Sequence, residues 1–356
     1  MIVESLATLT MITLAPVELH GGMVVDEPIV DVTMQGVAVG SAEEPSWISW
    51  DRIASVTGED GRDAREYMSL ADDLWRARIR LARGDVVLAE GIFEELFELY
   101  LGTSGASALV VAEGRLRCAL NQGFQADALV PWLEVVRLRG QGERLAGEPP
   151  LPSILDETTS LLPALPPFLI GEGDDNVLAS LEAMSDTRTL SGSFASLYLA
   201  ILGERASEID SQWADHPGVL LLLDCREALH AQGATRHRAR DALRERIEDN
   251  PDTWIEAWCR VALAESLVRE GESEQDEERT IEGVLEMLHL PARFERTQVF
   301  LAGYALARVS QLLDGLGEHE AGASLARTLL DNHPLHPASE HLRRQSVTRM
   351  SQEERE

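Results

Sequence analysis

The sequence contains no lysine, because all 31 of its basic residues are arginine. This absence excludes the lysine of P-loop nucleotide-binding proteins and of protein kinases, and it excludes Schiff-base chemistry on a lysine side chain. Cysteine is also scarce: only Cys118, Cys225 and Cys259 occur in 356 residues. They lie far apart among apolar neighbours and form no CxxC pair, so we expect buried core residues and no zinc or redox site.

Basic residues are outnumbered by 61 acidic ones, and the formal net charge is −30. A surface of this charge repels phosphate backbones, which argues against general nucleic-acid binding. Aromatic residues make up only 5% of the chain, while the hydrophobic fraction of 44% is ordinary for a globular protein. This balance favours helices that pack through leucine and alanine.

Histidine offers a weak metal candidate near the end of the chain. Two of the four histidines there, His333 and His336, have a spacing that suits a metal pair on a helix. A proline follows each of them, however, and places both in a loop. The other two are His319 and His341. We therefore predict no metal-binding, cofactor-binding or catalytic residues and no cofactor.

Long hydrophobic runs are missing as well, and we predict no integral membrane span. The most apolar segment, residues 1–16, is too short to cross a bilayer as a helix. Its length fits the apolar core of a signal peptide, but no basic residue precedes it and it contains Glu4. Export to the periplasm and a cytoplasmic location both stay open, with export slightly favoured.

Residues 17–58 have the alternating pattern of short strands. Apolar runs such as Val37-Ala38-Val39 are separated by glycine or proline at intervals near ten residues, which predicts a small β meander or barrel. The segments Leu19-x-Gly21-Gly22, Gly36-Val37-x-Val39 and Ile48-Ser49-Trp50-Asp51-Arg52-Ile53 resemble the SH3-like or Sm-like modules near the start of some bacterial, often planctomycete, proteins. The resemblance implies a fold and a docking surface, and no reaction.

Residues 59–140 have a helical period and an internal repeat. Gly84 ends one apolar helix and is followed by Ala89 and Phe93; Gly123 is followed at the same offsets by Ala128 and Trp132. This is the turn and second helix of a helical hairpin, the unit of stacked α-solenoids. Through these alanine and aromatic positions the hairpins resemble tetratricopeptide repeats, although the first-helix signature of that family is missing. We expect both aromatic side chains to be buried between the helices of their hairpins.

The remaining chain is predicted to continue the array after an interruption. Residues 141–175 contain six prolines but also many leucines, which indicates an ordered crossover that packs on the helices. Residues 176–345 resume as helical hairpins, and residues 346–356 form a charged tail. We expect the turns of the second helical region at Gly233, Gly271 and Gly317.

Two arginine stripes are the candidate partner-binding residues. Within each stripe the side chains are spaced to lie on one face of a helix, where like charges repel unless acidic neighbours neutralise them. Asp72 and Glu248 are each four residues from a stripe arginine, and we favour such neutralisation over an exposed anion-binding strip. If a stripe lines a groove, it would hold an acidic peptide or a C-terminal carboxylate. The stripes are Arg76, Arg80 and Arg83, and Arg236, Arg240 and Arg244.

Together these patterns predict a mostly α-helical, tetratricopeptide-like solenoid preceded by a small β-module. The function we favour is non-catalytic: a scaffold or adaptor that binds a protein or peptide partner in a helical-repeat groove. One alternative is an envelope-associated structural protein whose β-module docks to a larger assembly. A less favoured alternative is an enzyme with a site in the proline-rich crossover. The partner and the oligomeric state do not follow from the sequence.

Overall fold

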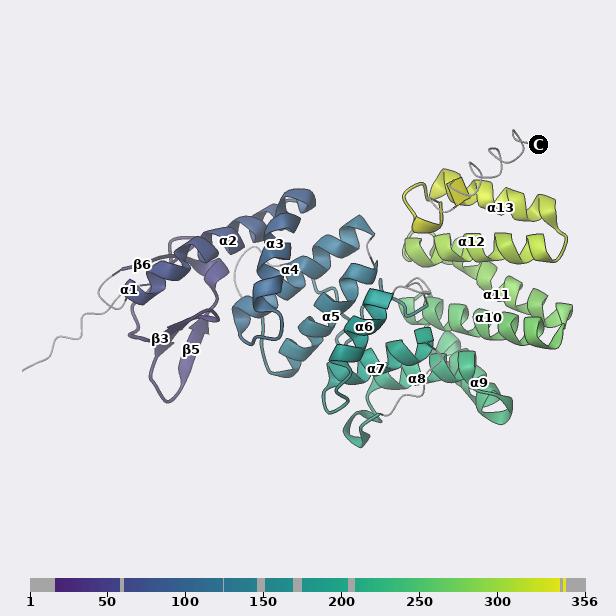
Figure 1. Cartoon of the computed structure of the whole chain (residues 1–356), viewed down its shortest axis with the longest axis horizontal. Helices are drawn as coiled ribbons and strands as arrows, with labels where there is room; N and C mark the ends of the chain where they lie inside the picture. The colour runs from purple at the N-terminus through teal and green to yellow at the C-terminus, as the bar shows by residue number, and fades with distance from the viewer. Residues whose placement is uncertain are drawn as a thin grey trace, which may run out of the picture. The chain divides into compact units, whose positions relative to one another are not determined.

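The structure is a computed structural model, and it describes residues 17–57, 61–123, 125–145, 151–168, 175–203, 209–339 and 342–343. The candidate signal peptide and the charged tail lie outside these residues. Helix accounts for 67% of the structure, in thirteen α-helices that follow a small β-region. The predicted fold class is therefore confirmed, and every strand of the described residues lies between Val17 and Val56 (Figure 1).

The chain divides into two compact units. The first comprises Met1–Cys118 and Arg137–Pro152, and the second comprises Ala119–Val136 and Ser153–Glu356. Two helices, α4 (Ala106–Gln122) and α5 (Gln125–Gly140), contribute residues to both units.

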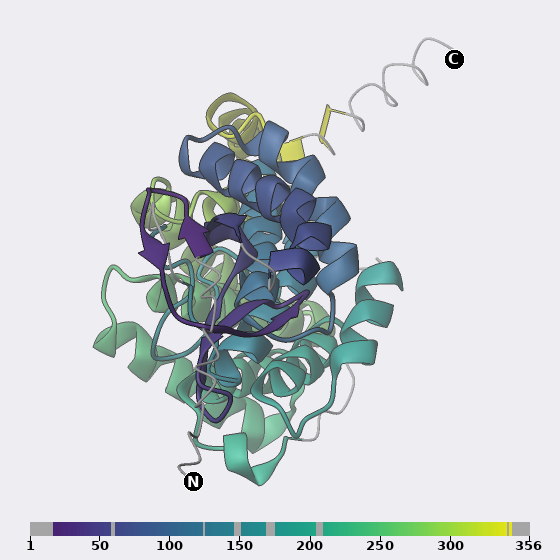
Figure 2. The ribbon, with the colours of Figure 1, turned by 90° about the vertical axis from the view of Figure 1, so that its left-hand side faces the viewer.

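The β-region of the first unit consists of two small antiparallel sheets, with strand orders β2-β1-β6 and β3-β4-β5. Figure 2 shows these short strands in purple. Gly36 has a positive φ where β4 passes β5, and a Cβ atom there would collide with the backbone of Ile48. The strands are β1 (Val17–Leu19), β2 (Val24–Val25), β3 (Ile29–Thr33), β4 (Gly36–Gly40), β5 (Pro45–Ile48) and β6 (Ile53–Val56).

This β-region is too small to form a large core of its own, and it is bonded to the helices of its unit. The Tyr100 hydroxyl donates a hydrogen bond of 2.7 Å to the carbonyl of Met34. The Ser107 hydroxyl accepts from the backbone N–H of Trp50 and donates to the carbonyl of Gln35. Trp50 itself is fully buried. The sheets and the helices of the first unit therefore share one core.

The predicted helical hairpins are present in the first half of the chain. Gly84 and Gly123 both have positive φ, as expected of glycines that end a helix. Phe93 and Trp132 are buried, with 1% and 0% of their surfaces exposed. The helices are α1 (Gly61–Ala64), α2 (Met68–Ala82), α3 (Val86–Tyr100), α4 (Ala106–Gln122) and α5 (Gln125–Gly140).

The described residues 153–168 of the proline-rich segment belong to the second unit, where side chains of its helices donate hydrogen bonds to their backbone. Trp132 donates to the carbonyl of Ser160 at 3.3 Å, Tyr198 to that of Leu165 at 2.6 Å, and Trp258 to that of Pro163 at 3.1 Å. Its apolar side chains are buried as well: Leu155, Leu161, Leu162 and Leu165. A proline-rich segment has few backbone bonds of its own, so these three aromatic donors help to hold it in place.

The helices of the second unit continue the hairpin pattern. From α8 to α13 each helix packs on the next in the chain, and α10 also contacts α8 and α12. Figure 1 shows α12 and α13 side by side in yellow. The helices are α6 (Asp175–Met184), α7 (Leu190–Gly203), α8 (Pro217–His230), α9 (Gly233–Asp249), α10 (Trp254–Glu274), α11 (Glu277–Phe294), α12 (Val299–Gly315) and α13 (His319–Asn332).

The prediction of a turn at Gly271 is wrong. Helix α10 runs through Gly271 to Glu274, and the chain turns at Gln275, which has a φ of 57°. Gly271 instead lies where α10 meets α11, and a Cβ atom there would come closer than 3.0 Å to backbone and side-chain atoms of Thr280. This glycine permits close helix packing. The expected turns at Gly233 and Gly317 are confirmed by their positive φ.

Candidate functional site

The first arginine stripe lies on α2 and is mostly exposed. The Arg76 guanidinium pairs with Asp73, and its Nε donates to the backbone carbonyl of Asp72, so the carboxylate partner differs from the predicted one. Arg80 donates from Nη1 to the carbonyl of Leu88 at 2.9 Å. Arg83 is exposed at the end of α2, and its guanidinium has no polar partner among the residues that the structure describes.

Two apolar side chains at the start of α3 stand next to this stripe. Val87 is 75% exposed and Leu88 is 59% exposed, although their size would normally favour burial. The hydrogen bond from Arg80 to Leu88 joins the α2 stripe to this apolar pair. We call Arg76, Arg80, Arg83, Val87 and Leu88 the hairpin surface.

The second stripe, on α9, has two arginines that bond to α10 and one that faces solvent. Arg240 is 98% buried and donates to the Ser266 hydroxyl at 2.9 Å, to the Ser266 carbonyl at 2.7 Å and to Glu270 at 2.6 Å. Arg236 bonds the same carboxylate at 3.2 Å. Burial disfavours ionised Glu270, but the bonds and charges of the two arginines outweigh it and lower the pKa of its carboxyl. These two arginines therefore tie α9 to α10.

The third arginine of this stripe behaves differently. Arg244 is exposed and pairs at 3.0 Å with Asp241, three residues earlier, and its pairing with Glu248 was predicted wrongly. On a helix both spacings bring side chains together, so the sequence cannot decide between the two carboxylates. Arg244 and Arg76 are thus equivalent in exposure and in the spacing of their partner.

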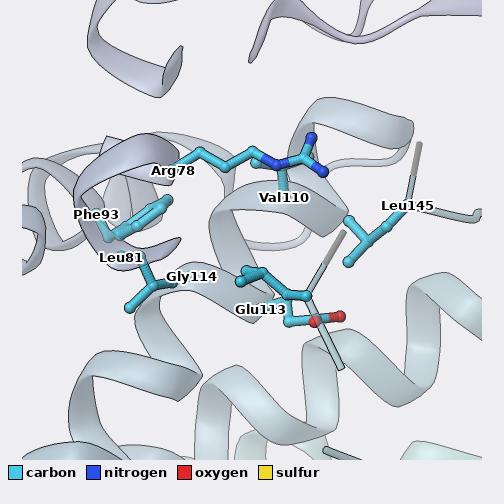
Figure 3. Close-up of a pocket in the computed structure, with 8 residues that line it drawn as sticks. Arg78, Leu81, Phe93, Val110, Glu113, Gly114 and Leu145 are labelled. Carbon is cyan, nitrogen blue, oxygen red and sulfur yellow. The ribbon is translucent and has the colours of Figure 1, made fainter. Parts of the chain in front are cut away.

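A pocket of about 110 Å³ lies within the first unit, between α2, α3 and α4. Five of its eight lining residues have apolar side chains, and two carry charges: Arg78 and Glu113. In the view of Figure 3 their charged groups lie on opposite sides of the space, with Phe93 and Leu81 toward one end and Leu145 toward the other. The remaining lining residues are Val110, Gly114 and Leu151.

Both charged pocket residues are buried and paired. Arg78, 6% exposed, forms an ion pair with Asp51 of the β-region. Glu113, 2% exposed, accepts from Arg117 at 2.6 and 3.1 Å and from Arg139 at 3.0 Å. Burying a charged group is costly unless a group of opposite charge bonds to it, and these ion pairs provide such partners.

The predicted histidine cluster does not form a metal site in the described part of the chain. His333 is buried at 6% exposure, with Nε2 3.8 Å from a Glu295 carboxylate oxygen. His336 accepts from the backbone N–H of Ala338 on Nδ1, so its Nε2 carries the proton and donates to the carbonyl of Phe300 at 3.1 Å. Burial lowers the pKa of His336 to about 4. No group of three or more potential metal ligands occurs among the described residues, which exclude His341.

The cysteines are free and buried, as expected. Burial raises the pKa values of Cys118 and Cys259 to about 12, so these thiols are protonated and unreactive at neutral pH. Among the helices that the structure describes, none combines the length and the apolar character of a membrane span.

Sequence reasoning missed the exposed apolar pair and the two charged pocket residues. A weak signal existed for Glu113, which interrupts a run of apolar residues in α4 and therefore needs a buried partner. Val87 and Leu88 gave no such signal, because their positions were consistent with a buried helix face.

Comparisons of the chain with protein families, with curated proteins and with solved structures found no match.

Proposed function

We propose that this protein is a non-catalytic scaffold or adaptor whose hairpin surface binds an acidic, partly apolar segment of a partner protein. Its helical hairpins are tetratricopeptide-like in this proposal, and such arrays serve chiefly as binding surfaces. The observation that carries the proposal is the exposure of Val87 and Leu88 beside Arg76, Arg80 and Arg83.

The apolar half of the surface supplies affinity. Full burial of a valine or leucine side chain is worth roughly 1.5–3 kcal/mol, and most of that gain is unused while Val87 and Leu88 face water. A partner that covers both side chains therefore recovers free energy that the isolated protein does not.

The basic half of the surface supplies selectivity. Arginine presents five N–H donors in a rigid plane and suits carboxylates, and Arg80 and Arg83 stand at the turn beside the apolar pair. The local charge favours a partner segment with aspartate or glutamate next to its apolar anchors.

The proposal is tested with a displayed random-peptide library selected against the full-length protein. We expect the enriched peptides to combine acidic and large apolar residues, and their binding, measured by fluorescence anisotropy, to weaken as salt is raised. R76E and R83E should weaken binding in a salt-sensitive way. V87D should weaken it without removing an arginine.

The matched control is R244E, which reverses an equally paired and exposed arginine on α9 and should leave peptide binding unchanged. Circular dichroism confirms that each variant is folded. Peptides whose binding is insensitive to R76E, R83E and V87D, or a selection that yields no acidic peptides, would refute the hairpin surface as the partner site.

A further inference from the structure

Helix α11 of the second unit has an exposed apolar pair on one face. Ile281 is 47% exposed and Leu285 is 60% exposed, and residues four positions apart are neighbours on a helix surface. The buried residues of α11, which include Val284 and Met287, lie on its other side, where the helix packs against α10 and α12. The pair therefore faces water while the rest of the helix is used in the fold.

Two carboxylates lie on the same face as this pair. Glu277 and Glu278 precede Ile281 by four and three positions, and both are exposed. Neither side chain forms an ion pair or a hydrogen bond in the part of the chain that the structure describes. Their place in the first turn suits the helix dipole, but it leaves the carboxylates in water. We call Glu277, Glu278, Ile281 and Leu285 the α11 surface.

The α11 surface complements the hairpin surface. Each surface has two large apolar side chains in water, and the hairpin surface adds arginines where the α11 surface adds glutamates. Arg83, Glu277 and Glu278 have no polar partner among the described residues. Contact between the two surfaces would bring opposite charges together and remove all four apolar side chains from water.

This complementarity points to a second copy of the chain as the partner. The hairpin surface belongs to the first unit and the α11 surface to the second, so every copy carries both. Pairing two hairpin surfaces would bring arginines together, and pairing two α11 surfaces would leave Val87 and Leu88 in water. Building on the proposed function, we propose that the hairpin surface of one copy binds the α11 surface of another, in a head-to-tail assembly.

Sedimentation velocity of the full-length protein measures this association. An interface made by a few side chains is weak, so we expect oligomers to form as the concentration is raised from about 10 to about 500 µM. Because opposite charges meet at the interface, raising the salt concentration from about 50 to about 500 mM should weaken the association at least about threefold.

Two double variants each remove one surface. R83E/V87D changes the hairpin surface, and E278R/L285R changes the α11 surface. Each variant alone should be monomeric, because every contact needs one surface of each kind. An equimolar mixture should form a heterodimer and nothing larger, because one intact surface of each kind remains and the two lie on different chains.

The matched control is R244E/L220D, which changes an exposed arginine and an exposed apolar side chain outside both surfaces. It should associate as the parent does. Circular dichroism confirms that all variants are folded.

Several outcomes would overturn the proposal. If R83E/V87D or E278R/L285R still associates by itself, or if their mixture stays monomeric, the two surfaces do not bind each other. If the parent stays monomeric while the selected acidic peptides bind the hairpin surface, the proposed function stands and a second copy is not the partner. If the peptides also fail to bind, the proposed function fails with it.

Discussion

Replacing Gly114 by alanine tests the packing between α3 and α4. A Cβ atom at this position would lie closer than 3.0 Å to three ring atoms of Phe93, whereas ordinary contacts are 3.4–4 Å. Phe93 is 1% exposed, so the ring has little freedom to retreat. Overpacking of this kind costs about 1–3 kcal/mol, and the higher helix propensity of alanine offsets up to about 1 kcal/mol. We expect a net loss of about 1–2 kcal/mol.

Gly91 on α3 provides the matched control. It is also in a helix, but a Cβ atom there would meet no atom within 4 Å, so G91A should stabilise the protein by about 0.5–1 kcal/mol. Urea denaturation followed by far-UV circular dichroism measures both variants. In the G114A/F93A double variant the new methyl group occupies part of the vacated space, so the combined loss should be smaller than the sum of the single losses. If G114A were as stable as G91A, α3 and α4 would not pack as described.

Three further predictions concern other parts of the chain. Trp132 is fully buried against Phe194 and Tyr198, so W132A should lower the free energy of unfolding by about 3–5 kcal/mol, measured by urea denaturation; a loss below about 1 kcal/mol would contradict this packing. R240M removes the shortest hydrogen bond of Glu270 and should lower the free energy of unfolding by about 3–5 kcal/mol. R244M, at an exposed ion pair, should lower it by less than about 1 kcal/mol, and equal melting temperatures of the two variants would refute this difference. Burial lowers the pKa of His336 from its ordinary value of 6.5 to about 4 in the folded protein, so protonation favours the unfolded chain. The free energy of unfolding should therefore fall by about 3 kcal/mol as the pH falls from 6.5 to about 4. His336→Asn, which keeps an acceptor for the Ala338 N–H, should flatten that part of the pH–stability profile; an unchanged profile would contradict the assignment.

Local patterns in the sequence were sufficient for the type of secondary structure and for part of the core. Alternation with glycine turns predicted the β-region, and the repeated offsets after Gly84 and Gly123 predicted two hairpins with buried aromatic residues. These features depend on neighbours within a few residues, where backbone sterics and burial periodicity act directly. Gly271 shows the limit of that reasoning, because a glycine that ends a helix and one that allows two helices to touch are identical in sequence.

The tertiary structure alone decided which charged and apolar side chains face water. Arg240 and Arg76 are each followed by another arginine four residues later, yet Arg240 is enclosed by Ser266 and Glu270 of the next helix and Arg76 stays exposed. In the same way, Arg78 and Glu113 meet around one pocket although 35 positions separate them in the chain. The sequence by itself determined helices, turns and periodic faces, since these depend on local interactions. Only packing between distant segments determined the hairpin surface and the pocket, because burial and ion pairing at each position depend on which elements lie opposite.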